Sequence, residues 1–292
     1  MSTIEVGGLI LGTPSIFQYH FMQNAFIAGT LVAIVAGVIG YFMVIRNQSF
    51  AGHSLANVGF AGATGAALFG IPALLGLFLA GVIAAIGIHY LGIGARHSQR
   101  SDVAIGAVFT ASLALGFLFV HLSTTQSVNI YNVLFGNILG ISDSDVTITW
   151  IAALCGLVLI MLALRPLLFA SVDPLVAAAR GVPVAWLGLG FLLVLAVVVA
   201  VAVQIVGVLL IFSLLVTPAA TARRISPRPI VAIGLSIILA VICTWLGLIA
   251  GYYTSLPVSF FIATFAFIFY ILVRSGYGSH LPRRATIDAP HH

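Results

Sequence analysis

The sequence predicts an all-α polytopic membrane protein with about eight full transmembrane helices and one short or re-entrant leg. Of its 292 residues, 62% are apolar and only 6% are charged, whereas about a quarter are charged in soluble domains. The apolar residues form continuous runs without the alternation of a transmembrane β-barrel. All 11 basic residues are arginines, and most stand between the runs. The composition therefore excludes a soluble globular protein, and the scattered net charge of +5 argues against nucleic-acid binding.

Apolar runs of roughly the length that a membrane requires follow one another along the chain. They cover residues 17–45, 51–70, 72–92, 103–121, 146–164, 184–203, 205–220, 229–250 and 257–274. The run 205–220 is the short leg, and Pro218 interrupts it. We expect the turn before it, near Gln204, to lie within the depth of the membrane, where irregular backbone lines a cavity or is buried in protein. Gln204 and Pro218 are therefore candidate pathway or gating residues.

The arginines predict the topology. They form five groups separated by pairs of runs, and the positive-inside rule places every group in the cytoplasm. Residues 1–292 then form a single transmembrane domain with an external tail at 1–16 and a cytoplasmic tail at 275–292. The segment 122–145, which contains Asp143 and Asp145 but no arginine, falls outside. The expected location is a cytoplasmic membrane that the chain crosses several times.

No enzyme motif is present in the sequence. A P-loop requires a lysine against the phosphates, and the chain has no lysine. The two cysteines, Cys155 and Cys243, lie inside apolar runs, which disfavours a disulfide framework or a cysteine metal site. We therefore expect no enzymatic activity and no resident cofactor, and any ATP-driven transport must use ATP bound by a separate subunit.

His53 and Asn57 are the candidate metal-contacting residues. Their i, i+4 spacing places them on one helix face. They follow Arg46 by seven and 11 residues, which corresponds to roughly 10 to 17 Å into the membrane. Polar side chains at that depth are costly and usually functional. The alternative is a histidine that bonds across a helix interface.

A second candidate region is the segment 165–183, which the topology places in the cytoplasm. Asp173 can cap a short helix that starts at Pro174, and Gly181 can end it. Such a helix is a suitable contact for a cytoplasmic motor subunit, and an ordinary loop is the alternative. Ala177 lies within the segment, and we assign Asp173, Ala177 and Gly181 to this candidate coupling helix.

The sequence resembles the ABC-3 family of permease subunits of bacterial zinc, manganese and iron ATP-binding-cassette importers. The resemblance covers nearly the whole chain and rests mainly on four stretches. They are RNQSFAGHSLANVGFAGATG (46–65), SDVAIGAVFTASLALG (101–116), VDPLVAAARGVPV (172–184) and VGVLLIFSLLVTPAATAR (206–223). YNVLFGNILG (131–140) also fits.

The resemblance implies a dimeric permease, here a homodimer or a heterodimer, with two ATP-binding cassette subunits and an external metal-binding protein. The family's Gly-Asp-x-x-x-His segment lines its pathway, and aligning it on Gly52 puts His53 and Asn57 at the two ligand positions. This chain departs from the pattern at both. A homodimer would present two imidazoles and two amides without negative charge. The segment from Asp173 to Gly181 matches the family's coupling helix.

The leading function is therefore import of a divalent transition metal, zinc or manganese, by a permease that a separate ATPase drives. One alternative is a secondary carrier, although proton coupling normally relies on intramembrane carboxylates or histidines. Another is a permease of the same architecture for a metal chelate or other small solute.

Overall fold

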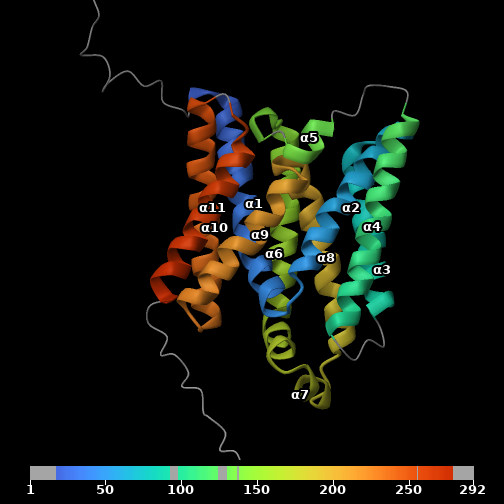
Figure 1. Cartoon of the computed structure of the whole chain (residues 1–292), viewed down its shortest axis with the longest axis vertical. Helices are drawn as coiled ribbons and strands as arrows, with labels where there is room; N and C mark the ends of the chain where they lie inside the picture. Colours follow the sequence, from blue (N-terminus) through green and yellow to red (C-terminus); the bar gives the residue numbers. More distant parts are fainter. Residues whose placement is uncertain (1–17, 93–97, 124–129, 137, 255, 279–292) are drawn as a thin grey trace, which may run out of the picture.

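The computed structural model describes residues 18–92, 98–123, 130–136, 138–254 and 256–278, and every regular element in these ranges is a helix (Figure 1). Two short helices, α5 (Ile130–Phe135) and α7 (Pro174–Ala179), lie at opposite ends of the bundle, which we call the α5 end and the α7 end. The predicted tails lie outside the described residues, apart from 275–278. The long helices are α1 (His20–Ile45), α2 (Ser49–Leu68), α3 (Ala73–Gly92), α4 (Ser98–Leu122), α6 (Asp143–Val172), α8 (Val184–Val206), α9 (Val208–Ile225), α10 (Pro229–Tyr253) and α11 (Val258–Gly278).

Eight of the described helices are long and apolar enough to cross a membrane, which confirms the predicted multi-pass fold class. The predicted short leg is α9, which continues through Pro218 to Ile225. Its 18 residues make it the shortest of the long helices, and at about 27 Å it is only just long enough to cross. The short leg is therefore a continuous helix, and α2 is the long helix that is too weakly apolar to count among the eight.

Burial within the bundle explains how α2 tolerates its polar residues. Fourteen of its 20 residues are buried, most of them small. A methyl group on Gly62 would collide with the carbonyl oxygen of Gly76 in α3, and one on Gly76 would collide with the carbonyl oxygen of Gly62. Small residues permit this close approach of two helix backbones. The helix therefore lies against α3, α4, α8 and α9 rather than against lipid.

The arginines of the helix termini and turns gather at one end of the bundle, together with Asp102 and Asp173, and two further aspartates lie at the other. Successive long helices alternate in direction, so that α1 begins at the α5 end and α11 finishes at the α7 end (Figure 1). Asp143 and Asp145 lie in the first turn of α6, at the α5 end. The α7 end carries the described arginines of the helix termini and turns, namely Arg46, Arg180, Arg223, Arg224, Arg228 and Arg274. This is the distribution on which the predicted topology depends.

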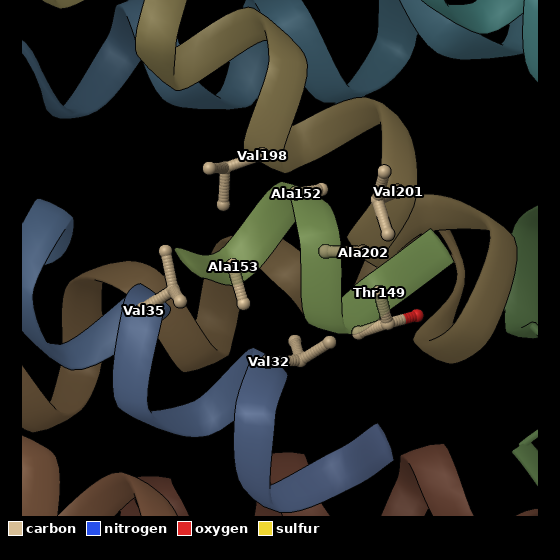
Figure 2. A pocket seen from close by; sticks show the side chains of 8 residues that line it. All are labelled: Val32, Val35, Thr149, Ala152, Ala153, Val198, Val201 and Ala202. Carbon is tan, nitrogen blue, oxygen red and sulfur yellow. The ribbon is translucent and has the colours of Figure 1, made fainter. Parts of the chain in front are cut away.

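The packing between α1, α6 and α8 leaves a void of only about 10 Å³ (Figure 2). Valine and alanine side chains line it, apart from Thr149, whose hydroxyl donates to the carbonyl of Asp145. A void of this size and polarity has room for about one water molecule and no partners to hold it. This region is core, and the functional residues lie elsewhere.

Candidate functional site

His53 lies in the second turn of α2, among phenylalanine rings from three helices. The ring of Phe212 in α9 meets the imidazole edge-on, with 4.7 Å between the ring centroids. Phe109 in α4 lies at 5.5 Å, and Phe50 in α2 stacks at 6.4 Å. Aromatic pairs at these separations favour defined ring orientations. The three phenylalanines, here called the aromatic collar, therefore orient the imidazole by apolar contact.

Asn57 follows His53 by one turn on the same face, as its spacing predicts. Its Nδ2 donates to the backbone oxygen of His53 at 2.9 Å and lies 3.4 Å from His53 Nε2. The other ring nitrogen, Nδ1, is buried and has no hydrogen-bond partner in the described part of the chain. The ring thus forms no hydrogen bond to another described helix, in contrast to the interface alternative. An orphaned buried nitrogen is destabilising by about 1–3 kcal/mol and calls for a functional reason.

The pair lies deep within the bundle. α2 and α9 run in opposite directions, and the second turn of one meets the second turn of the other at His53 and Phe212. At 1.5 Å per residue, α9 continues for about 20 Å from this contact to Ile225, and α2 for about 22 Å to Leu68. His53 is therefore about 20 Å along α9 from the end of that helix at Ile225, but only seven residues from Arg46 at the α7 end.

One chain supplies too few donors to hold a metal ion firmly. Among the described residues, no three His, Cys, Asp or Glu side chains gather closely enough to form a metal site. His53 and Asn57 contribute one imidazole nitrogen and one amide oxygen, both uncharged. Two donors from one chain leave most coordination positions of a divalent ion to water or to other groups.

The candidate coupling helix has the predicted local structure. Asp173 Oδ1 accepts from the backbone N–H groups of Leu175 and Val176 at 3.1 and 3.0 Å, and Pro174 is the first residue of α7. Gly181 has a φ of +83°, in the left-handed region that ends helices. Ala177 is fully buried, whereas Leu175 is 82% exposed. The exposed side of α7 at the tip of the bundle is thus available to a partner (Figure 1).

The two candidate pathway residues of the α8–α9 region lie apart. Gln204 is exposed on the last turn of α8 and donates to Asp145 Oδ1 at 3.0 Å, whereas Pro218 is buried inside α9. The turn between the helices lies beneath α5 (Figure 1). Gly136 and Gly207 meet there with φ of +74° and +85°, and a methyl group on either would collide with backbone atoms next to the other. The turn that we expected within the membrane is therefore covered by α5.

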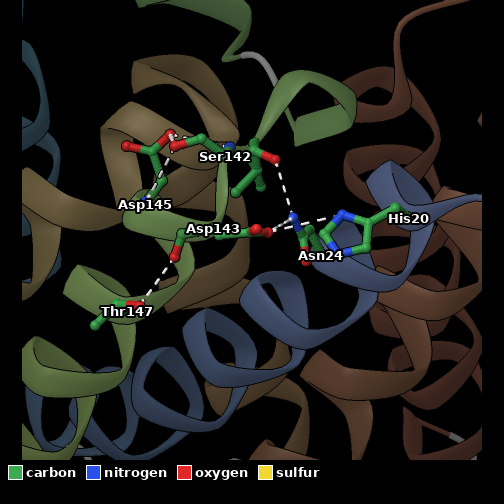
Figure 3. A network of polar contacts seen from close by, with 7 residues as sticks. His20, Asn24, Ser142, Asp143, Asp145 and Thr147 are labelled. Atoms are coloured by element: carbon green, nitrogen blue, oxygen red, sulfur yellow. Dashed lines mark hydrogen bonds and ion pairs between the residues drawn. The ribbon is translucent and has the colours of Figure 1, made fainter.

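A polar network occupies the α5 end, where α1 meets α6 (Figure 3). Asn24 is buried and donates to Asp143 Oδ1 at 2.7 Å and to the carbonyl of Ile141 at 3.3 Å. His20 Nδ1 lies 3.7 Å from the same carboxylate, with both side chains mostly exposed. We did not predict this network from the sequence, because the partners are more than 100 residues apart.

The comparisons with known proteins agree with this architecture. A model of the ABC 3 transport family matches residues 18–275. The chain is 35% identical over 240 residues to a manganese transport system membrane protein of Halalkalibacterium halodurans, which covers 82% of this chain and 80% of that protein. It is 34% identical over 255 residues to a manganese import system permease protein of Streptococcus parasanguinis, covering 87% and 90%. The chain therefore belongs to the ABC 3 transport family, as its motifs predict.

Solved structures give the same result. The chain superimposes on a chain of PsaBC from Streptococcus pneumoniae, solved in complex with Fab, with a TM-score of 0.78 and 32% identity. The match covers 88% of this chain and 92% of the other. A putative metal-chelate type ABC transporter in an inward-facing conformation gives a TM-score of 0.69 at 18% identity, covering 87% and 86%. The second match shows a shared fold only.

Sequence reasoning missed the aromatic collar. Phe212 stands within a stretch that carries the family resemblance, but nothing in the sequence pairs it with His53. Phe109 likewise comes from a different helix, α4. Only the packing of α2 against α4 and α9 brings the three rings to the imidazole.

Proposed function

We propose that this chain is the permease subunit of an ATP-binding-cassette importer that carries a divalent transition metal into a bacterial cytoplasm. Membership in the family supports the transporter class. The names of relatives support the cargo, since two are manganese transport proteins and one, from Haemophilus influenzae, is a probable iron transport protein. Manganese is the first metal to test, followed by zinc. Within the molecule, the observation that supports a metal as cargo is the pair of His53 and Asn57 on one face of α2.

The proposal includes several partners. ATP is hydrolysed by a separate cassette subunit that docks on α7, and an external metal-binding protein delivers the ion at the α5 end. Two permease copies contribute two His53 and two Asn57 side chains to one path. The arginine-rich α7 end faces the cytoplasm, as the positive-inside rule requires, so that the N-terminus lies outside and the C-terminus inside.

Two alternatives remain distinct from this proposal. A secondary carrier would work without an ATPase, but the described carboxylates stand at helix starts, as Asp102, Asp143 and Asp145 do, or in the α7 cap. A permease for a metal chelate would transport the chelate and reject the free ion. Co-purification with a cassette ATPase would favour the importer over the secondary carrier. Competition between free and chelated metal for uptake distinguishes the importer of the free ion from a permease for the chelate.

The central experiment measures metal uptake per permease molecule. Cells that lack their own importers would express the chain with its partner subunits, and radioactive manganese and zinc uptake would be divided by membrane abundance. We expect His53→Ala to abolish uptake at unchanged abundance, because it removes the imidazole donor. His121→Ala, at an exposed position of α4, is the control and should transport normally. Normal uptake per molecule by His53→Ala would contradict the role of this site.

A second experiment addresses α7. Gly181→Val forces a β-branched residue to adopt a φ of +83°, although nothing lies within 4 Å of the added methyl position. We expect normal insertion, loss of uptake and weak co-purification of the cassette subunit. Gly190→Val adds the same bulk inside α8, also with nothing within 4 Å, and should keep both properties. Full retention of the cassette subunit and of uptake by Gly181→Val would contradict docking at α7.

A further inference from the structure

Asn57 presents the nitrogen end of its amide, rather than the oxygen, to the imidazole of His53. Its Nδ2 lies 2.9 Å from the backbone oxygen of His53. A carbonyl oxygen accepts hydrogen bonds and never donates them, so the amide group beside it must be the donating NH2 group. The same Nδ2 lies 3.4 Å from His53 Nε2. The backbone contact therefore fixes which end of the amide meets the ring.

The polarity of this contact determines the tautomer of the neutral imidazole. An amide nitrogen donates and does not accept, so Nε2 can bond to it only through a lone pair. In the neutral ring the proton is then on Nδ1. The opposite tautomer would turn two N–H groups toward each other and would lose the bond, which at 3.4 Å is a long one. Within the described part of the chain, no partner at Nδ1 opposes this choice.

The two ring nitrogens also differ in their surroundings. Nδ1 is buried, and the centroids of the collar rings lie 4.7 to 6.4 Å from that of the imidazole. Nε2 lies beside Asn57, which is half-buried. A metal-binding histidine usually donates its second N–H to a carbonyl or carboxylate, which fixes the tautomer. His53 has no such partner among the described residues, so that Asn57 fixes the tautomer from the other side of the ring.

We propose that Asn57 is a positioning residue that holds His53 as the Nδ1–H tautomer and thereby makes Nε2 the atom that binds the metal ion. The proposal rests on the proposed function. Nε2 has a single lone pair, so an arriving ion displaces the amide N–H from it. The amide can then turn its oxygen toward the ion, because one end of an amide donates and the other accepts. The unpartnered Nδ1–H is the cost of keeping the lone pair on the other nitrogen.

Nitrogen NMR of the metal-free complex in lipid vesicles tests the tautomer. The histidines are isotope-labelled, the pH is one at which free histidine is uncharged, and the His53 signals are those missing from His53→Phe. We expect the proton on Nδ1. Asn57→Leu keeps the shape of the side chain without its N–H, and the ratio of Nδ1–H to Nε2–H should fall about tenfold, or about 1.4 kcal/mol. His121, exposed on α4, is the control and should keep its ratio in this variant.

Addition of zinc chloride to the same complex tests the coordinating atom. We expect the Nε2 signal of His53 to move to the position of a metal-bound nitrogen, while Nδ1 keeps its proton. A purely structural role of Asn57 would lower membrane abundance in Asn57→Leu without changing the tautomer ratio. The proposal is overturned by a proton on Nε2 in the unmodified complex, by an unchanged ratio in Asn57→Leu, by an equal change at His121 or by zinc on Nδ1.

Failure of this proposal and failure of the proposed function give different results. If the unmodified complex imports manganese or zinc and His53→Ala abolishes import, but the proton is on Nε2, Asn57 does not select the tautomer and the transport function stands. If the complex imports neither metal and zinc leaves both ring nitrogens unchanged, the proposed function fails. Nε2 is then not a metal ligand, whichever tautomer the ring adopts.

Discussion

The polar network at the α5 end and the surroundings of His53 differ in how fully they satisfy polar side chains. At the α5 end, Asp143 accepts from Asn24 and Asp145 accepts from Gln204, and water reaches most of these groups. In the interior, His53 keeps a buried nitrogen without a partner in the described part of the chain, and phenylalanine rings surround it. Asn24 is buried and has two acceptors, whereas the buried imidazole of His53 keeps one nitrogen without a partner among the described residues.

We interpret this difference as one between a structural network and the proposed transport site. A network with satisfied hydrogen bonds joins α1 to α6 and has its effect through stability. An under-satisfied pair in a helix of small residues contributes little to stability, so that its presence requires another explanation. Substitutions at the α5 end should therefore change abundance or thermal stability, whereas interior substitutions should change transport per molecule.

The largest effect within this comparison is expected for Asn57→His. Two permease copies would then present up to four imidazoles, which are stronger nitrogen ligands for zinc than an amide oxygen is. We expect the purified complex to retain zinc at least about tenfold more strongly, or about 1.4 kcal/mol, and to transport more slowly because release is harder. Metal content after dialysis and uptake rate are the measurements.

Asn57→Gln, which keeps an amide, is the matched control for metal retention. It should bind no more zinc than the unmodified complex. Unchanged zinc retention in Asn57→His would mean that residues 53 and 57 do not form one site. The assignment of the His53 region to transport would then be wrong.

An intermediate effect is expected for Asn24→Ala at the α5 end. The substitution removes the donor to Asp143 and to the carbonyl of Ile141, which lowers stability by about 1–3 kcal/mol. Thermal unfolding of the purified protein should shift to lower temperature, while uptake per remaining molecule stays normal. A loss of uptake per molecule at normal stability would assign the network to the transport machinery instead.

The smallest effect is expected for His20→Ala, which serves as the control for Asn24→Ala. His20 pairs with the same carboxylate, but the two side chains are 70% and 77% exposed. Exposed ion pairs contribute about 0–1 kcal/mol, so that no measurable change in thermal unfolding is expected. A shift as large as that of Asn24→Ala would show that the exposed contact of His20 with Asp143 stabilises the protein as much as the hydrogen bonds of the buried Asn24 do.

Local patterns in the sequence predicted much of the molecule. Composition predicted the helical spans, and the Asp173–Pro174–Gly181 pattern predicted a capped helix that the structure confirms. The spacing of His53 and Asn57 correctly predicted a shared face. These features depend on neighbouring residues, so that backbone periodicity and capping rules are sufficient.

Contacts between distant segments could not be predicted in this way. The aromatic collar joins α2, α4 and α9, and the glycines at 136 and 207 meet only because α5 folds over the turn between α8 and α9. The length of α9 was also underestimated, because Pro218 was expected to interrupt it and instead lies within the continuous helix.

The sequence by itself determined that this chain is a multi-pass helical protein with arginines at one end, because hydrophobicity and charge act on each segment separately. It also determined which side chains share a helix face, because the helical repeat is fixed. Only the tertiary structure decided that His53 lies against Phe212 and that its Nδ1 has no partner among the described residues. These features arise from the fit of helices far apart in the chain, and no local rule encodes that fit.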